Sequence, residues 1–369
     1  MQKHKLLDSI RLGDLELRNR VVMAPMTRAR AEASSHLATD LMAEYYRQRA
    51  GAGLIITEGT WPNDESVGFV NVPGMFTKQQ SDSWKKVTNS VHEHGGKIFS
   101  QLGHCGPNAH PDLLGGKLPV SASAINIRSM AFTPSGIKET FTPKEMSKED
   151  IERTQADFTK AAQFAKEAGF DGLEIHSSQT YLFPAFMSSE FNHRTDEYGG
   201  SKENRARLLL ETIDNVIKVW GPNRVSVKLQ PYVKMGGFAP NADTEPTFLY
   251  VVEQLNQRQL AFLHLMGDQK SADLPDQMKR PWIQAKKFYK GRILAGGGFT
   301  QESGEKAIND DEADMIAYGE PFIANPDLVE RFKTNLPLTP SIRELHYAGG
   351  AKGYIDYEIA TASSSSQRR

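Results

Sequence analysis

The 369-residue sequence has little of what marks a secreted or membrane-spanning protein. Its single cysteine, Cys105, excludes an intrachain disulfide and is typical of a reducing compartment. No stretch approaches the roughly 20 apolar residues that a transmembrane helix needs. Mixed polar residues follow Met1 to Lys5, where a signal peptide would have its apolar segment. We therefore expect a cytoplasmic location and no membrane partner.

The sequence also lacks an excess of either charge. Lys plus Arg number 44 and Asp plus Glu number 45, so the net charge is −1 with neutral histidines. This balance gives no electrostatic footprint for nucleic acid or an anionic membrane. A chain of this length buries roughly three quarters of its unfolded surface, so it does not depend on disulfides for stability. A globular protein without a nucleic-acid partner is expected.

What the sequence does contain is a repeated alternation of short apolar runs and helical segments. The runs do not alternate with polar residues, which is typical of parallel strands buried on both faces. Eight such units favour a single closed (β/α)8 barrel, a TIM barrel, over an open doubly wound sheet. One of the intervening helices is predicted from Gln277 to Tyr289. The strands are predicted at Val21–Ala24, Leu54–Thr57, Lys97–Leu102, Leu173–Ile175, Val225–Leu229, Leu260–His264, Arg292–Ala295 and Met315–Tyr318.

Three segments lie outside this repeat. Apolar residues alternate around Gly13, which predicts an N-terminal hairpin within residues 4–17. A Gly-, Pro- and Ser-rich loop runs from 103 to 143 after the third strand, and loops that long are usually functional. The low-complexity tail, residues 361–369, is expected to be disordered. The barrel domain is therefore predicted to span residues 1–360.

Polar and glycine residues gather where the predicted strands end. In a barrel, catalytic groups lie at the C-terminal ends of the strands, and phosphate binds near the loops after strands seven and eight. Gly297 and Gly298 follow the seventh strand and Gly319 the eighth, and glycines there let backbone N–H groups approach a phosphate. The pattern predicts a phosphorylated cofactor or substrate. The other residues at strand ends are Thr27, Gly59, Gln101, His176, Lys228 and His264.

Three proton-handling side chains follow the fourth predicted strand. His176 and Gln179 can hold a carbonyl oxygen by two hydrogen bonds. The phenol of Tyr181 beside them can donate a proton. A lone histidine is more often structural, but an amide and a phenol beside it at a strand end favour a catalytic function.

Two other kinds of site are disfavoured. His104, Cys105 and His110 do not have the spacing of a common zinc site, so no metal is predicted. Ser177 is disfavoured as a nucleophile activated by His176. The side chains of adjacent residues in a turn rarely form the hydrogen bond that such activation requires.

Motifs along nearly the whole chain resemble one family. They are Leu17–Arg28, Glu58–Thr60, Gln101–Leu102, His176–Leu182, Asn192–Arg207, Phe322–Leu328 and Gly353–Tyr357. The stretch from Arg194 to Arg207 is highly specific. In this order they resemble the old yellow enzyme family of flavoprotein ene reductases, which implies a (β/α)8 barrel that binds FMN.

The resemblance also implies a role for each matching residue. NAD(P)H, with NADPH as the expected reductant, would reduce FMN, and hydride would then pass to the β-carbon of an α,β-unsaturated carbonyl compound. His176 and Gln179 would polarise the carbonyl oxygen, and Tyr181 would protonate the α-carbon. The enzyme would be a monomer or a homodimer. The FMN-binding residues would be Pro25, Met26, Thr27, Gly59, Gln101, Lys228, Gly297, Gly298, Gly319 and Glu320.

The sequence departs from the family pattern at several of these positions. Gln179 stands where the family has His or Asn, and Gly103 stands where it has Trp, which predicts a more open pocket on that side. Lys228 replaces an Arg and loses its fork of donors. Glu320 replaces an Arg at the phosphate, where a carboxylate is repulsive unless it turns outward or finds a cation.

The last two departures motivate a second hypothesis. A family member that has lost FMN would act as a cofactor-free isomerase or cyclase, or as a non-catalytic binding protein. Lys228 and Glu320 favour this hypothesis, whereas the matching Thr27, Gln101 and Gly297 favour FMN. The sequence predicts an FMN enzyme with weakened phosphate binding.

Overall fold

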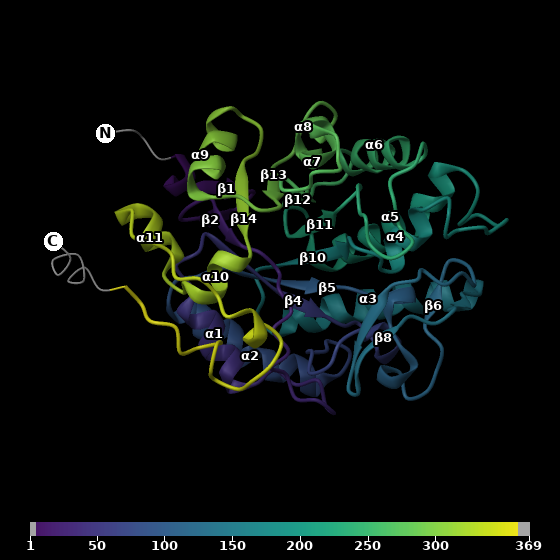
Figure 1. Ribbon diagram of the computed structural model, residues 1–369, viewed down its shortest axis with the longest axis horizontal. Helices are drawn as coiled ribbons and strands as arrows, with labels where there is room; N and C mark the ends of the chain where they lie inside the picture. Colours follow the sequence, from purple (N-terminus) through teal and green to yellow (C-terminus); the bar gives the residue numbers. More distant parts are fainter. Residues whose placement is uncertain (1–4, 361–369) are drawn as a thin grey trace.

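The computed structural model describes residues 5–360 and contains a closed barrel of eight parallel strands surrounded by helices (Figure 1). The strands follow one another around the barrel in the order β10-β11-β12-β13-β14-β3-β4-β5, and β5 pairs with β10. The predicted barrel is confirmed, because each predicted strand overlaps one strand of the barrel. The strands are β3 (Val21–Met23), β4 (Leu54–Thr60), β5 (Ile98–Leu102), β10 (Gly172–Ser177), β11 (Val225–Leu229), β12 (Phe262–Met266), β13 (Ile293–Gly296) and β14 (Met315–Tyr318).

The barrel strands are apolar on both faces because both faces are covered. One face packs on the helices, and the other fills the barrel interior with side chains such as Leu54, Phe99 and Leu294. The predicted hairpin is confirmed as β1 (Ile10–Leu12) paired with β2 (Leu15–Leu17). Its apolar side chains belong to the interior core, so the hairpin closes the N-terminal end of the barrel.

The helices begin and end where the sequence supplies caps. Ser147 accepts a hydrogen bond from the Asp150 backbone at the start of α3. The single helix predicted from Gln277 to Tyr289 is wrong, because Pro281 lacks an N–H and interrupts it. The longer helices are α1 (Asp40–Gln48), α2 (Lys78–Glu93), α3 (Lys148–Glu167), α5 (Lys202–Trp220), α6 (Thr244–Leu255) and α9 (Gln301–Asn309), and the shorter ones are α4 (Leu182–Met187), α7 (Asp276–Lys279), α8 (Pro281–Ala285), α10 (Glu320–Ala324) and α11 (Leu328–Thr334).

The long segment after β5 contains regular structure of its own. It contains an antiparallel hairpin, β7 (Met130–Thr133) and β8 (Gly136–Glu139), and a short parallel pair, β6 (Val120–Ser121) with β9 (Lys144–Glu145). The β7–β8 hairpin reaches the C-terminal segment of the chain, where the rings of Phe132 and Tyr347 lie 5.9 Å apart. The predicted tail at residues 361–369 lies outside the described residues.

The C-terminal segment is tied across the end of β3 by two arginines. Arg28 donates to the carbonyls of His346 and Gly353, at 2.9 and 2.8 Å. Arg30 donates to the carbonyls of Leu345 and His346, each at 2.9 Å. These bonds place the side chains around His346 over the C-terminal end of the barrel.

Candidate functional site

A cavity of about 560 Å³ lies at the C-terminal ends of the strands, within the usual range for small-molecule sites. Strand ends on one side of the barrel and the C-terminal segment line it together. Three predicted site residues, Gly297, Gly298 and Gly319, do not line it. The predicted residues that do are Pro25, Met26, Thr27, Gly59, Gln101, His176, Gln179, Tyr181, Lys228 and Glu320.

His176 is held as a neutral donor. The Ser178 backbone N–H donates to its Nδ1 at 3.4 Å, so the ring proton belongs on Nε2. Burial lowers the pKa of His176 well below its ordinary value, and the nearby Lys228 lowers it further. A neutral imidazole with its Nε2–H free in a cavity is suited to binding a carbonyl oxygen.

Tyr181 lies against His176, with the two rings stacked 4.8 Å apart. The side chain is only 4% exposed. Burial raises the pKa of Tyr181 well above its ordinary value, and the neighbouring Cys105 raises it further. The phenol therefore keeps its proton at neutral pH, as a proton donor must. The Cys105 thiol stays protonated as well, because burial raises its pKa.

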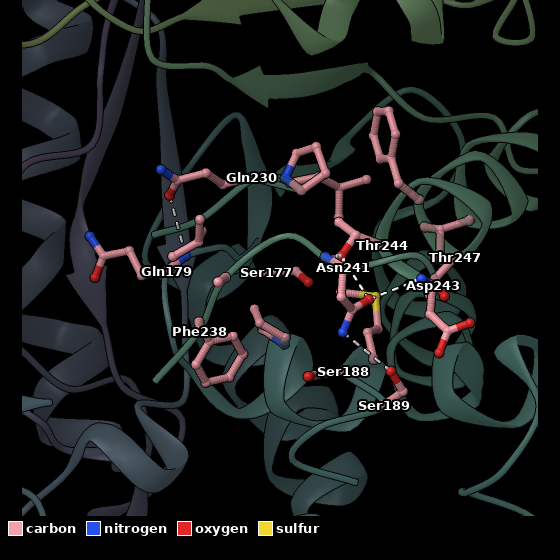
Figure 2. A pocket seen from close by; sticks show the side chains of 18 residues that line it. Ser177, Gln179, Ser188, Ser189, Gln230, Phe238, Asn241, Asp243, Thr244 and Thr247 are labelled. Atoms are coloured by element: carbon pink, nitrogen blue, oxygen red, sulfur yellow. Dashed lines mark hydrogen bonds between the residues drawn. The ribbon is translucent and has the colours of Figure 1, made fainter. Parts of the chain in front are cut away.

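Gln179 has an unusual backbone conformation. Its φ of +59° lies in the left-handed region, which residues other than glycine rarely adopt. Its backbone N–H donates to Gln230 Oε1 at 3.3 Å. The side-chain amide points away from Ser177 and the other residues that line the neighbouring pocket in Figure 2. Such backbone strain is often found at functional sites.

A buried carboxylate that the sequence analysis missed organises the strands beneath this cavity. Glu174 is fully buried in β10. Its Oε1 accepts from Gln101 Nε2 at 2.8 Å, and its Oε2 lies 2.9 Å from His264 Nδ1. Because the Gln101 amide nitrogen binds the carboxylate, the amide oxygen is free to accept a ligand N–H. The sequence did carry a signal for this residue, because Glu174 lies inside an apolar strand. A charged residue is almost never buried without a partner, so its position predicts buried hydrogen-bond partners.

Lys228 lies next to the same carboxylate. It sits in β11 opposite His176 in the strand register and is 7% exposed. Burial lowers the pKa of Lys228, and the charge of Glu174 opposes that shift. The family's Arg is thus replaced by a buried amine whose charge is favoured by the nearby Glu174 carboxylate.

The expected opening beside Gly103 is absent. A Cβ at Gly103 would lie 3.2 Å from His176 Cβ and 3.5 Å from Trp61 Cζ3. The Trp61 indole, which is 1% exposed, occupies the space and approaches Tyr181 with ring centroids 6.4 Å apart. Its Nε1–H has no hydrogen-bond partner within residues 5–360. The prediction of a more open pocket on this side was therefore wrong, because the Trp61 indole, directly after β4, occupies the space of the missing one.

The glycines after β13 pack against the loop after β12. A Cβ at Gly297 would lie 2.3 Å from the carbonyl oxygen of Gly267. Gln269 Nε2 donates to the Gly297 carbonyl at 3.1 Å. The Lys270 side chain lies over Gly298, 3.4 Å from the position of a Cβ there. This packing explains why these glycines do not line the cavity.

Glu320 is exposed at the start of α10 and joins a small polar cluster. Ser341 Oγ donates to its carboxylate at 3.3 Å and lies 2.9 Å from His346 Nε2. Arg343 lines the same cavity. The carboxylate that departs from the family pattern thus has a hydroxyl partner and shares its cavity with a cation. The sequence analysis missed Arg343 and His346 because their segment has no regular periodicity.

The alternative metal site gains no support from the geometry. Among residues 5–360 no three His, Cys, Asp or Glu side chains converge to hold a metal ion. His104 and His110 instead accept backbone hydrogen bonds from Gly106 and Asp112. No helix in the described part of the chain is long and apolar enough to cross a membrane.

The chain is similar to proteins of known family over nearly its whole length. Residues 5–339 match the model of the NADH:flavin oxidoreductase / NADH oxidase family. The chain is 35% identical over 367 residues to 12-oxophytodienoate reductase 2 of Arabidopsis thaliana, covering 96% of each protein. It is 37% identical over 361 residues to putative 12-oxophytodienoate reductase 3 of Oryza sativa subsp. japonica, covering 95% of this chain and 92% of that protein.

Solved structures agree with this assignment. Morphinone reductase superimposes with a TM-score of 0.91 at 36% identity, covering 96% of each chain. An old yellow enzyme homologue from Zymomonas mobilis also gives 0.91 at 36% identity, covering 96% of this chain and all of that one. The chain is therefore an oxidoreductase of the NADH:flavin oxidoreductase / NADH oxidase family, within the old yellow enzyme group that its motifs indicated.

Proposed function

We propose that this enzyme reduces the C=C bond of α,β-unsaturated carbonyl compounds, with FMN as its cofactor and NADPH as its reductant. The observation that carries the proposal is the convergence of a neutral His176, the Gln179 amide and a protonated Tyr181 on one cavity. The similar reductases of small organic compounds, 12-oxophytodienoate reductase and morphinone reductase, support a small-molecule substrate.

The residues at the strand-built end of the cavity fit a flavin ring. Gln101 offers its amide oxygen, because its nitrogen is bound to Glu174. Thr27 supplies a hydroxyl and Lys228 a buried amine at the same cavity. A Cβ at Gly59 would find its nearest neighbour, Trp61, at 3.6 Å, so the backbone there is open to close approach by a flat ring. The phosphate would lie toward Arg343, Glu320 and the glycines of the neighbouring loops.

The side chains divide the chemistry among them. FMN, held by residues such as Thr27, Gln101 and Lys228, would supply the hydride chemistry, with NADPH as the source of the hydride that reduces the β-carbon of the substrate. His176 Nε2–H and the Gln179 amide donate hydrogen bonds to the carbonyl oxygen, where negative charge develops as the β-carbon is reduced. Tyr181 O–H gives its proton to the α-carbon, and solvent then restores the phenol.

A second candidate function rests on the other end of the cavity. Glu320 occupies the place where the family has an Arg, and Lys270 and Gln269 pack onto the glycines of the phosphate region. A protein that cannot hold the phosphate would instead use Tyr181 and His176 as acid and base in a cofactor-free isomerisation or cyclisation. This candidate requires that the purified protein function without flavin.

The visible spectrum of the purified protein separates the two candidates. We expect flavin absorbance, either as purified or after incubation with FMN, and NADPH oxidation stimulated by cyclohexenone. A protein that stays colourless after FMN addition would exclude the ene reductase. Cyclohexenone-stimulated NADPH oxidation would exclude the cofactor-free candidate.

A further inference from the structure

A second cavity of about 90 Å³ lies beside the candidate active site. It is enclosed by α4, the end of β11, the loop that follows β11, and α6 (Figure 2). Its apolar lining includes Met187, Leu229, Phe238, Phe248 and Val251. The reaction proposed for His176 and Tyr181 makes no use of this cavity, and neither of them lines it.

Ser177 gives this cavity an unsatisfied polar group. The residue is 1% exposed, and its Oγ has no hydrogen-bond partner among residues 5–360. The Ser177 side chain is directed toward the other lining residues in Figure 2. A buried hydroxyl without a partner costs about 1–3 kcal/mol, so a ligand oxygen placed there gains a bond that the protein itself leaves unmade.

Two other polar groups of the lining already have partners in the protein. Thr247 Oγ1 accepts from Arg205 Nη2 at 3.0 Å. Asn241 accepts from the Asp243 backbone at 2.9 Å and from Thr244 Oγ1 at 3.3 Å. Of the lining hydroxyls among residues 5–360, Ser177 Oγ is the one that is buried without a partner, so a ligand oxygen would be oriented toward it.

The charges around the cavity define the class of ligand. No Lys, Arg or His is among its lining residues in the described part of the chain, and Asp243 at its exposed edge is the only ionisable one. A ligand anion would therefore be desolvated without a cationic partner, at a high cost in free energy.

The wall between this cavity and the candidate active site is formed in part by a proposed catalytic residue. Gln179 lines both cavities, and Ser177 precedes it on the same turn. The Gln179 N–H is bound to Gln230, which also lines the second cavity (Figure 2). A ligand in the second cavity would thus contact Ser177 and Gln179, which follow His176 along the chain.

We propose that this cavity is a second binding site, which takes the end of an uncharged, largely apolar molecule whose oxygen accepts a hydrogen bond from Ser177. The bound molecule contacts Ser177 and Gln179, which follow His176 along the chain. It shares Gln179 with the candidate active site but contacts neither Tyr181 nor the proposed FMN residues, so its binding does not require the reaction proposed above.

Methyl NMR of the full chain with labelled methionines tests this site directly. Met187 lines the second cavity and Met26 lines the active site, so the two signals report the two cavities separately. The probe is cyclopentanol, compared with cyclopentanecarboxylate as an anion of the same shape. We expect cyclopentanol to shift the Met187 signal with saturation and to leave Met26 unmoved, and the carboxylate to shift neither signal. No saturable shift at Met187, or an equal shift with the carboxylate, would overturn the proposal.

Two variants separate binding from damage to the fold. Ser177→Ala removes the hydroxyl and should weaken cyclopentanol binding about tenfold, the effect of one hydrogen bond. Ala239→Trp, at an exposed lining position, should block entry and abolish the Met187 shift. Ala156→Trp, on an exposed face of α3, is the matched control and should bind like the parent. Unchanged binding in both Ser177→Ala and Ala239→Trp would refute the assignment.

Discussion

The two ends of the active-site cavity are built in different ways. One end consists of strand residues held by buried hydrogen bonds, such as Gln101 and His264 on Glu174. The other end consists of loops and the C-terminal segment, where the exposed Glu320 accepts a hydrogen bond from Ser341 Oγ and has no other side-chain partner within residues 5–360. The first end keeps most of the residue types that the family motif requires, with Lys228 and Gln179 as its changes. The second end has a carboxylate, Glu320, in place of the family's Arg that would face the phosphate anion.

This difference separates two functions that flavin enzymes combine. In the proposed function the strand-built end would position the reacting atoms, where small displacements cost large factors in rate. The loop-built end would hold only the phosphate, and an exposed charge there contributes little free energy because water screens it. Changes at the strand-built end should therefore alter chemistry, and changes at the loop-built end should alter cofactor affinity alone.

The largest effect is expected at the strand-built end from Tyr181→Phe. The variant loses the phenolic proton but keeps the ring that stacks on His176. Loss of a general acid typically lowers the rate by about 10²–10⁴-fold. We expect that loss in enone reduction, measured by stopped flow, with the rate of flavin reduction by NADPH unchanged.

The internal control is the comparison of the two half-reactions in the same variant. Tyr198→Phe removes a hydroxyl that bonds Glu211, outside the cavity, and should leave both rates unchanged. Equal loss in both half-reactions of Tyr181→Phe would mean that the residue shapes the site and does not supply the proton.

The fold was predictable from the sequence to a greater extent than the site. Buried apolar runs such as Leu54–Thr57 indicated strands, because their two covered faces leave no place for polar side chains. The position of Trp61 was not predictable, since it depends on the space that Gly103 leaves across two strands. The contribution of Arg343 was equally hidden, because its segment is placed by the long-range bonds of Arg28.

A second large effect is expected from the buried carboxyl of Glu58, which supports the strand-built end from below. Its Oε2 accepts from the Arg28 backbone at 3.3 Å. Burial raises the pKa of Glu58 to about 7. The folded protein thus favours the protonated acid, and the resulting stability is full below the ordinary pKa and is lost as the pH rises to about 7. The shift corresponds to about 3 kcal/mol.

Glu58→Gln should remove this dependence, because the amide does not titrate. We expect the free energy of urea unfolding of the parent, relative to the variant, to fall by about 3 kcal/mol between pH 4.5 and pH 8. Subtracting the variant cancels the titration of other groups. A difference that stays constant over this range would show that Glu58 is ionised throughout.

A smaller effect, confined to affinity, is expected from Glu320→Arg at the loop-built end. The change replaces a repulsive charge by an attractive one near the predicted phosphate. The change removes one repulsive charge and adds one attractive charge, and each contributes at most about 1 kcal/mol at an exposed position, so we expect FMN to bind up to about thirtyfold more tightly. Quenching of flavin fluorescence would measure the affinities for FMN and for riboflavin. The riboflavin affinity should not change, because riboflavin has no phosphate.

Glu152→Arg makes the same charge change at an exposed position on α3 and is the matched control. It should leave the affinities for both flavins unchanged. If Glu320→Arg tightened riboflavin as much as FMN, the carboxylate would act on the ring and the distinction between the two ends would fail.

The smallest effect is expected from Arg343→Gln. Arg343 lines the cavity with Glu320 and offers a cation to the phosphate, but it is exposed, so its contribution should be at most about 1 kcal/mol. We expect FMN binding to weaken by up to about fivefold, which is that free energy expressed as an affinity ratio, and the loss to shrink as salt is added. Arg11→Gln, on the hairpin at the opposite end of the barrel, should have no effect. A charge interaction with the phosphate is screened by salt and does not occur with riboflavin. A loss of FMN affinity that persists in high salt, or a loss of riboflavin affinity as well, would therefore mean that Arg343 shapes the C-terminal segment.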